Sequence, residues 1–242
     1  DRFVEVGIAE QNMIGVSAGL AASGKTVFAS TFAVFATGRC WEQIRLSVAY
    51  PKLNVKIVAT HCGISVGADG TSHQALEDIS LMRSLPNMTV VSPADAYETY
   101  DATLAISEKD GPFYMRMGRS DVPTIMPEDT GFRIGKASVL VDGKDVSLVG
   151  TGQMVHACLE AAKILRKEGI SAEVVNMSTI GGLGSAVAEY ISEEGFVPLT
   201  RIGTRDTFGE SGTPEELFKK YGLTAEDVAS AARKSMAKRR RS

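Results

Sequence analysis

Short β-rich runs alternate with longer segments of helical periodicity along most of this 242-residue chain, and this alternation limits the possible folds more than any other feature. Such an order is typical of α/β proteins, in which helices cover a mainly parallel sheet. We therefore predict two three-layer α/β/α domains, the first with a mainly parallel sheet. The strands expected in the first domain are Phe3–Val6, Thr26–Ser30, Val55–Thr60, Thr89–Ser92 and Pro112–Met117. The helices expected between them are Glu10–Ala22, Val34–Ala49, Ala75–Ser84 and Asp95–Ser107.

A change in composition after residue 120 predicts a boundary between the two domains. Residues 121–143 are rich in proline and glycine, so we expect a linker there, with one domain over 1–120 and a second over 144–242. The chain begins inside an expected strand, which indicates that the first domain is N-terminally incomplete. The elements expected in the second domain are strand 145–149, helix 154–168, strand 172–177, helix 183–192, strand 197–202 and two helices that start at Thr213 and Thr224.

The composition argues against several classes of protein. Apolar residues make up 44% of the chain, but no run approaches the about 18 residues of a membrane-spanning helix. The net charge of −3 gives no broad basic surface, and the basic cluster Lys238–Arg241 is interpreted as a solvated tail. We therefore expect neither nucleic acid nor a membrane as a partner. Three cysteines without a C-x-x-C pair indicate a reduced, cytoplasmic chain, and no histidine has zinc-ligand spacing, so no metal site is expected.

The first candidate functional residue is Glu10. It follows Gly7-Ile8-Ala9 and starts a mostly apolar helix at the expected carboxyl end of a strand. Ligands of open α/β sheets bind at that edge. From position alone, a carboxylate that only favours the positive end of the helix dipole remains the alternative.

Two further segments contain residues suited to ligand binding. Phe32 and Phe35 project from one side of a turn after a strand, although core packing would explain that spacing equally well. The loop from His61 to His73 contains glycines, two histidines and Asp69, and has little apolar material to offset the entropy of ordering it. Histidines beside an aspartate suit proton transfer or recognition of hydroxyl groups.

Taken together, these motifs resemble the pyrimidine-binding half of a thiamine-diphosphate enzyme, and specifically transketolase. Gly7–Gln11 is similar to the segment with the family's glutamate, and Ser30–Phe32 to the aromatic segment under the cofactor ring. Gly67–His73 resembles the substrate loop G-E-D-G-P-T-H, with Ala68 and Thr71 in place of Glu and Pro. Gly181–Ser185 and Phe208–Gly212 look like stretches of the family's C-terminal domain, so the resemblance covers nearly the whole chain.

The resemblance implies roles for the cofactor-binding residues. Glu10 would share a proton with N1′ of the aminopyrimidine of thiamine diphosphate, and burial is expected to raise its pKa for that purpose. Phe32 and Phe35 would hold the pyrimidine ring by stacking. His73 would lie close to the thiazolium, and both Glu10 and His73 are therefore predicted to be catalytic.

The resemblance also implies a site for sugar phosphates. Asp69 and His73 would recognise sugar hydroxyls, while His61 would lie farther out, toward the phosphate. Arg119 aligns with the arginine that binds this phosphate, a role suited to a planar fork of donors. Arg116 is the weaker candidate, with an ion pair as its alternative role. Gly150-Thr151-Gly152 could also cradle an anion, but its third glycine is missing, and we interpret it as a structural turn.

Departures from the family pattern predict a divided enzyme. The chain has no G-D-G…N signature, so the diphosphate and its divalent metal, Mg or Ca, would be bound by a partner chain. The resemblance is thus to the C-terminal subunit of a split transketolase, inactive alone, which forms a homodimer and an α2β2 complex with an N-terminal subunit. About 25 residues of the family pattern are also missing between Ile180 and Gly181.

The predicted activity is transfer of a two-carbon ketol unit between sugar phosphates (EC 2.2.1.1). Three alternatives remain open: a 1-deoxyxylulose-5-phosphate synthase-like enzyme, a 2-oxo acid dehydrogenase E1 β-like subunit, and a non-catalytic scaffold of the same fold. His61 argues against the first, and the histidine-bearing G-x-D-G-x-x-H pattern against the second. Retention of Glu10, Phe32, Asp69, His73 and Arg119 argues against the third.

Overall fold

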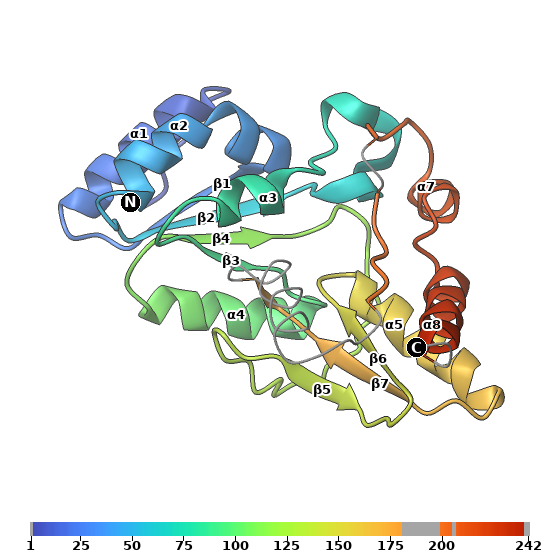
Figure 1. Ribbon diagram of the computed structural model, residues 1–242. Coiled ribbons are helices and arrows are strands. Elements are labelled where there is room, and N and C mark those ends of the chain that lie inside the picture. Colours follow the sequence, from blue (N-terminus) through green and yellow to red (C-terminus); the bar gives the residue numbers. More distant parts are fainter. Residues whose placement is uncertain (1, 181–198, 205–206, 240–242) are drawn as a thin grey trace.

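A five-stranded sheet organises the first half of the chain in the computed structural model, which describes residues 2–180, 199–204 and 207–239 (Figure 1). The strand order is β1-β2-β4-β3-β8. The first four strands are parallel, and β8 pairs with β3 in the antiparallel direction at one edge. The mainly parallel sheet predicted for the first domain is therefore confirmed. The strands are β1 (Val27–Phe32), β2 (Val55–Thr60), β3 (Thr89–Val91), β4 (Phe113–Arg116) and β8 (Thr179–Ile180).

Helices cover both faces of this sheet, as Figure 1 shows. One face carries α1 (Glu10–Ala22), α3 (Asp78–Arg83) and an irregular helical stretch, and the other face carries α4 (Ala96–Glu108). The irregular stretch runs through η1 (Phe35–Arg39), α2 (Trp41–Gln43) and η2 (Ile44–Ala49), where π-type turns interrupt the α-helix expected over Val34–Ala49.

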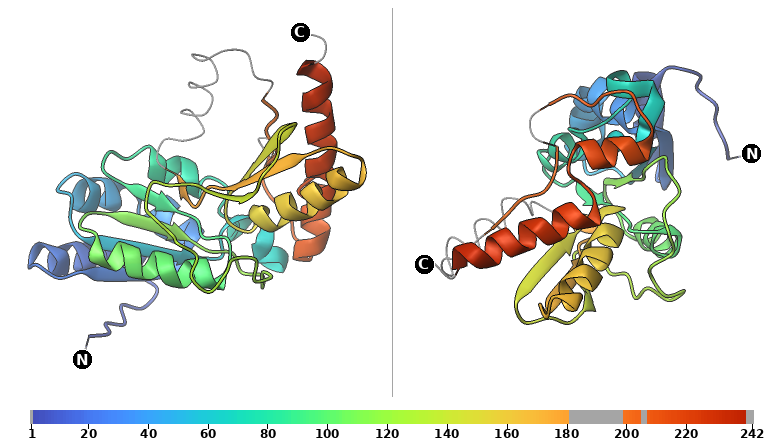
Figure 2. Two further views of the ribbon diagram at one scale, coloured as in Figure 1. Left: turned by 90° about the horizontal axis from the view of Figure 1, so that it is seen from below. Right: turned by 90° about the vertical axis from the view of Figure 1, so that its right-hand side faces the viewer.

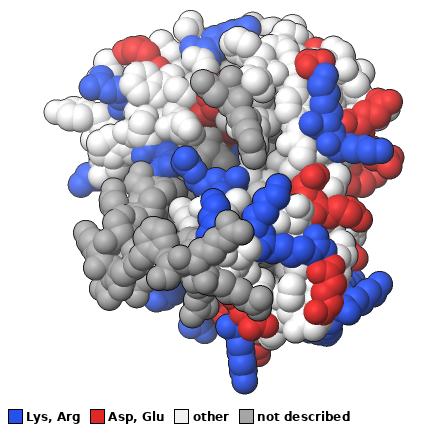
Figure 3. Space-filling view, turned by 45° about the vertical axis from the view of Figure 1, so that its right-hand side comes forward, with Lys and Arg blue, Asp and Glu red and all other residues white. Residues whose placement is uncertain are grey.

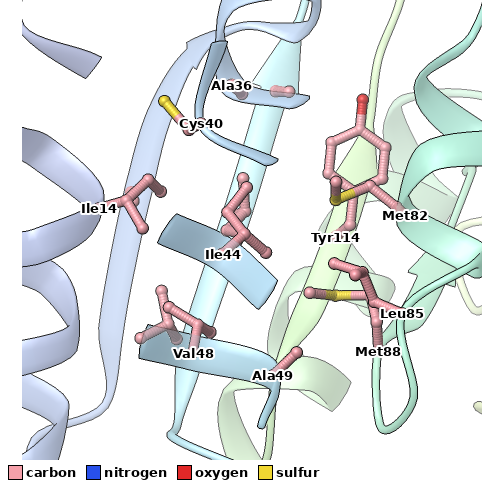
Figure 4. Close-up of a cluster of buried hydrophobic side chains, with 14 of the residues drawn as sticks. Ile14, Ala36, Cys40, Ile44, Val48, Ala49, Met82, Leu85, Met88 and Tyr114 are labelled. Carbon is pink, nitrogen blue, oxygen red and sulfur yellow. The ribbon is translucent and has the colours of Figure 1, made fainter. Parts of the chain in front are cut away.

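The core of the first domain lies between the sheet and the first of these helical layers (Figure 4). Ile14 of α1, Ile44 of η2, Met82 of α3 and Tyr114 of β4 are all completely or almost completely buried there. Burial of such side chains contributes about 1.5–3 kcal/mol each, so this cluster fixes α1 and the η1–η2 stretch against the strands.

The second domain is a smaller α/β unit. Its sheet has the order β5-β7-β6, with β6 and β7 parallel and β5 antiparallel to β7. The helices α5 (Met154–Lys167) and α8 (Ala225–Arg239) pack against each other and against this sheet (Figure 2). Their contacts use small apolar side chains such as Cys158, Ala161 and Ala229. The elements are β5 (Ser138–Val141), β6 (Val146–Gly150), β7 (Ala172–Asn176), α5 (Met154–Lys167), α7 (Pro214–Lys220) and α8 (Ala225–Arg239).

The two C-terminal helices begin where the sequence predicts. Thr213 accepts a hydrogen bond from the backbone N–H of Glu216, and the Glu216 side chain accepts one from the backbone N–H of Thr213. This reciprocal capping box, with Pro214 at the first helical position, stabilises the start of α7. Thr224 and Asp227 make the same kind of contact at the start of α8.

The structure differs from the predictions at the N-terminus. Residues Phe3–Val6 form no strand, and Figure 2 shows this segment running away from the sheet. No neighbouring strand lies beside them among the described residues, so their backbone groups have no ladder to join. The side chains of Phe3 and Val4 are correspondingly exposed.

α1 is only partly buried, although its mostly apolar sequence favours burial of most of its circumference. The helix buries one face, which includes Met13, Ile14 and Ala18, while Leu20 remains 38% exposed. The other exposed positions of the helix include Gln11 and Asn12 and two glycines, so its open face is mostly small and polar.

The boundaries of the second domain need one change. β5 lies within the segment 121–143 that was expected to be a linker, yet it pairs with β7 in the second sheet. The expected helix 183–192 and the first two residues of the expected strand 197–202 lie outside the described residues. Leu199–Ile202, the described remainder of that strand, is not in a strand.

The surface carries charges of both signs. On the face shown in Figure 3, basic and acidic side chains are interspersed, in agreement with the small net charge of −3. Within the described part of the chain, no helix combines the length and the apolarity needed to cross a bilayer.

Candidate active site

The candidate residues of three parallel strands come together at one edge of the first sheet. Phe32 is the last residue of β1 and is in register with Thr60, the last residue of β2, so that His61 follows at the same level. Arg119 comes after β4, whose continuation at Met117 donates a backbone hydrogen bond to Ala59. The carboxyl ends of these strands therefore form the site, as expected for an open α/β sheet.

Four rings form an aromatic cluster at this edge. The ring centroids of Phe32 and His61 are 3.7 Å apart with planes within 10°, and those of Phe32 and Phe35 are 6.2 Å apart with planes within 5°. His73 meets Phe32 and Phe35 edge-on, with centroid distances of 6.3 and 5.4 Å. Sequence spacing left open whether the two phenylalanines only fill the core. In the structure both are partly exposed and face histidines of the candidate site.

His61 has an unusual backbone and a perturbed acidity. Its φ angle of 58° lies in the left-handed region, a conformation that costs a residue with a side chain roughly 1–3 kcal/mol and that is concentrated at functional sites. Burial lowers the pKa of its imidazole, and the positive charge of Arg119 adds to this, while Asp69 opposes it. His61 thus lies within electrostatic reach of Asp69 and Arg119 as well as against Phe32.

Glu10 is buried, with 7% of its surface exposed, and is paired with Arg39. The Arg39 Nη1 donates to the Glu10 Oε2 at 2.8 Å, and the guanidinium carbon lies 4.5 Å from the centroid of the Phe35 ring. Arg39 therefore connects the carboxylate to the aromatic cluster. Sequence reasoning missed Arg39, although it follows Phe35 by four residues, which places the two side chains on one helical face.

The acidity of Glu10 corrects an expectation from the sequence. Burial does raise the pKa of this carboxyl, but its backbone hydrogen bond and the hydrogen bond and charge of Arg39 outweigh burial, so the pKa lies below its usual value. The prediction of a raised pKa is wrong for the chain in this state because it counted burial and not the neighbouring guanidinium.

The loop that contains Asp69 and His73 is the helical segment η3 (Gly63–Ser72), which is interrupted by two glycines in left-handed or strained backbone. A Cβ atom at Gly70 would lie 2.4 Å from the Ser211 hydroxyl oxygen, and one at Gly67 would lie 3.2 Å from the carbonyl oxygen of Gly212. These glycines therefore let the segment before α7 pack directly on the loop, an approach that is visible in Figure 1.

Hydrogen bonds fix this contact between the two domains. The Thr71 hydroxyl donates to the carbonyl oxygen of Gly209, and the Gln74 Nε2 donates to the carbonyl oxygen of Glu210 at 2.9 Å. The stretch Phe208–Gly212, which the sequence assigned to the second domain, thus covers the candidate substrate loop. The position of Asp69 and His73 depends on both halves of the chain.

Arg119 lies at the mouth of a hollow between the domains. Its Nη1 donates to the carbonyl oxygen of Val66 at 2.6 Å and lies 3.6 Å from Asp69 Oδ2, and both charged side chains are nearly half exposed. The hollow has a volume of about 640 Å³. Its lining is formed by Ser65–Ala68, Arg119–Asp121, Gly212–Pro214 and Glu216.

Two weaker candidates have structural roles. Arg116 forms a buried ion pair, with its Nε 2.7 Å from Asp78 Oδ2, and the Tyr114 hydroxyl donates to the same oxygen at 2.7 Å. In the turn Gly150–Gly152, the backbone N–H of Gly152 donates to the carbonyl oxygen of Ser92 at 3.2 Å. A Cβ atom at Gly152 would lie 2.7 Å from the Ser92 hydroxyl, so this turn packs tightly against the first domain.

The donor set at the sheet edge fits an aminopyrimidine. The Glu10 carboxylate already accepts a hydrogen bond from the guanidinium of Arg39, a flat, nitrogen-bearing cation that lies on the face of Phe35. Flat rings and a buried carboxylate are the groups that such a heterocycle requires. In the ranges that the structure describes, no three His, Cys, Asp or Glu side chains are gathered as a metal ion would need.

Comparisons with known proteins agree with this geometry. Residues 1–124 match the family model "Transketolase, pyrimidine binding domain", and residues 135–180 and 178–228 match "Transketolase, C-terminal domain". The chain is 49% identical, over 98% of its length and 84% of the relative's, to a putative transketolase C-terminal section of Methanocaldococcus jannaschii. It is 43% identical, over 96% of its length and 80% of the relative's, to a 6-deoxy-6-sulfo-D-fructose transketolase subunit of Clostridium sp. strain MSTE9.

One solved structure is as similar to this chain in sequence as the Methanocaldococcus relative is. It is described as a split gene transketolase, inactive beta4 tetramer, and it matches with a TM-score of 0.90 and 49% identity over 98% of this chain and 84% of that chain. The fold and the site thus define a pyrimidine-binding domain followed by a transketolase C-terminal domain. This chain belongs to the transketolase family, which uses thiamine diphosphate.

Proposed function

We propose that this chain is the C-terminal subunit of a two-polypeptide transketolase that moves a two-carbon ketol unit from a ketose phosphate to an aldose phosphate (EC 2.2.1.1). The observation that carries the proposal is the connected cluster of Glu10, Phe35, Phe32 and His73 at the carboxyl edge of a parallel sheet. The two relatives described above carry transketolase names over nearly the whole length of this chain.

In the proposed site, each of the chain's own residues has a separate role. When bound, thiamine diphosphate supplies the carbon that accepts the two-carbon unit and the electron sink that stabilises its negative charge. Glu10 would hold a proton at the pyrimidine nitrogen, and Phe32 and Phe35 would orient the ring. His73, which lies against both rings, would hydrogen-bond to hydroxyl groups of the sugar near the reacting carbon.

The anionic end of the sugar is assigned to Arg119, with His61 toward that end, while Asp69 would recognise a sugar hydroxyl. Arg119 has five donors in a planar fork and lines the hollow between the domains, so a phosphate there could replace its present contacts. The Clostridium relative is named for a sulfosugar, 6-deoxy-6-sulfo-D-fructose. Like a sugar phosphate, this sugar ends in an anionic group. The preferred donor and acceptor sugars therefore depend on how this hollow is shaped around Arg119.

The diphosphate and its Mg or Ca ion are assigned to an N-terminal subunit. Relatives that match this chain almost end to end are described as a section or a subunit, which supports a divided enzyme. The exposed apolar side chains of Phe3 and Ile8 support self-association, and together these features favour an α2β2 complex. All three cysteines are buried free thiols, which suits a reducing, cytoplasmic compartment.

We also propose that about 25 residues of the family pattern are absent between Ile180 and Gly181. The C-terminal domain model matches in two separate segments that meet at this point. In addition, β6 lies at the edge of its sheet beside a hollow of about 720 Å³, where a further strand could begin to pair with it. None of the candidate site residues lies next to this junction.

The proposal is tested by Glu10→Gln in the complex with the N-terminal subunit. Turnover of a ketose phosphate with an aldose phosphate should fall by at least about 100-fold, the scale of a lost acid–base contribution. Arg45→Gln, a change at an exposed position of η2, serves as the control and should leave turnover unchanged. If pyruvate proves to be the two-carbon donor, the proposed activity is wrong, whereas normal turnover of E10Q would remove Glu10 from its proposed role.

A further inference from the structure

Arg39 makes, in this structure, the two contacts that the proposed function assigns to the aminopyrimidine of the cofactor. One contact is the hydrogen bond to Glu10 at 2.8 Å, and the other is the approach of its guanidinium to the ring of Phe35 at 4.5 Å. A guanidinium is flat, cationic and donates hydrogen bonds from its edge. It therefore resembles a protonated aminopyrimidine in shape, in charge and in hydrogen-bonding pattern.

The backbone of Arg39 is fixed, whereas its side chain is free to leave. The carbonyl oxygen of Arg39 accepts a hydrogen bond from Gln11 Nε2 at 3.0 Å, and the next residue, Cys40, is completely buried in the core. The Arg39 side chain is 47% exposed, against 8% for Glu10. A swing of Arg39 into solvent would therefore uncover Glu10 and the face of Phe35 without disturbing the core.

We propose that Arg39 is a built-in substitute for the cofactor's aminopyrimidine: it occupies Glu10 and Phe35 in the free chain and has to withdraw before the cofactor binds. The inference rests on the proposed function, because it takes the pyrimidine ring as the competitor of Arg39. It assigns to Arg39 a role in gating the site, which no motif of the chain indicates.

The charge state of Glu10 fits such a substitute. A buried carboxylate without a partner is costly, so the contact with Arg39 stabilises the ionised form of Glu10. Accordingly the pKa of Glu10 lies below its usual value although burial alone would raise it. Cys40, a titratable side chain close to this pair, has a pKa raised to about 11 by burial and by Glu10, and is neutral near pH 7. His73 also faces the site, edge-on to the ring of Phe35. Withdrawal of Arg39 would leave burial opposed only by the backbone hydrogen bond of Glu10, so the pKa of the carboxyl would rise and Glu10 could hold a proton more readily.

The test is titration of the full-length chain with the pyrimidine fragment alone, 4-amino-5-hydroxymethyl-2-methylpyrimidine, followed by NMR. Arg39→Gln removes the competitor, and the fragment should bind about fivefold more tightly than to the wild type, as expected for loss of a half-exposed ion pair. Arg39→Lys keeps a charge beside Glu10, and so protects the fold, but it loses the flat face on Phe35. This variant should also bind the fragment more tightly, whereas Arg45→Gln should bind it as the wild type does.

A second measurement does not depend on the fragment. The pKa of Glu10, followed through its ¹³C-labelled carboxyl group, should lie below the usual value in the wild type and should rise in R39Q. Unchanged or weaker fragment binding in both Arg39 variants, or an unchanged pKa of Glu10 in R39Q, overturns the inference and leaves the proposed function standing. Glu10→Gln should abolish binding of the fragment. If it does not, the pyrimidine site lies elsewhere and the proposed function fails together with this inference.

Discussion

The imidazole of His61 lies face to face with the ring of Phe32, with the two centroids 3.7 Å apart. This contact joins the ends of β1 and β2, and it depends on the left-handed backbone of His61, with φ of 58°. One face of Phe32 is thereby already covered in the free chain. A ligand ring at this site would have to use the remaining surface of Phe32 and the ring of Phe35.

The stacked position of His61 predicts its titration. Burial lowers the pKa of the imidazole, and the charge of Arg119 lowers it further, so its NMR midpoint should lie below the ordinary value near 6.5. Between pH 6.5 and the lowered pKa, His61 binds a proton more readily in the unfolded chain than in the folded chain. The folded state therefore loses stability as the pH falls through this range. Arg119→Ala should raise the midpoint because it removes a repelling charge. A wild-type midpoint above 6.5 would contradict the stacked and partly desolvated position.

Arg119→Ala also tests the phosphate assignment. In the reconstituted enzyme, KM for phosphorylated sugars should rise by about tenfold or more while kcat changes little, because an anchor for the phosphate contributes uniform binding. Hydroxypyruvate, which has no phosphate, should be affected much less. Arg133→Ala removes an exposed arginine that does not line the hollow and is the matched control. Equal losses with both donors would count against a phosphate site at Arg119.

The buried pair of Asp78 and Arg116 predicts a large effect on stability. Asp78→Ala would leave Arg116 buried without its counter-charge and Tyr114 without its acceptor, at a cost of about 3–5 kcal/mol in the free energy of unfolding. Glu160→Ala, which breaks the exposed pair with Lys163, should cost less than about 1 kcal/mol. Urea denaturation of both variants measures the difference, and similar small losses would show that the Asp78 pair is not desolvated.

The assignment of the cofactor to two chains predicts how the isolated chain behaves. We expect it to self-associate and to bind thiamine diphosphate poorly in calorimetry with Mg²⁺, because the diphosphate ligands belong to the partner. Addition of the N-terminal subunit should tighten binding and produce activity in the same titration. Micromolar affinity of the isolated chain would mean that it carries a complete site, and the divided enzyme would then be wrong.

Local patterns predicted most of the elements of the first domain. α1 and β2 begin and end where the sequence places them, at Glu10–Ala22 and Val55–Thr60, because helical periodicity and a buried β-rich run are local signals. β1 extends two residues beyond its prediction, to Phe32. That extension carries the phenylalanine into register with Thr60 and brings it to the site.

The features that were not predicted depend on contacts distant in sequence. The Arg39 guanidinium sets the pKa of Glu10 across 29 residues, and Thr71 contacts Gly209 across 138 residues. β5 joins its sheet through β7, which is still more than thirty residues away when β5 is complete. Propensity and spacing describe one segment at a time, and such pairings become visible only when the chain is folded.

The short strand β8 has a consequence for any attempt to divide this protein. Its Ile180 and Thr179 pair with Val90 and Val91 of β3, so the chain of the second domain completes the sheet of the first. The backbone N–H of Ser92 also donates to the carbonyl oxygen of Ser178 at 2.7 Å. A fragment that stops at residue 124 would therefore expose a bare strand edge, which is a template for aggregation. Gene division or domain exchange at the linker should thus yield insoluble pieces, unless residues 178–180 stay with the first half.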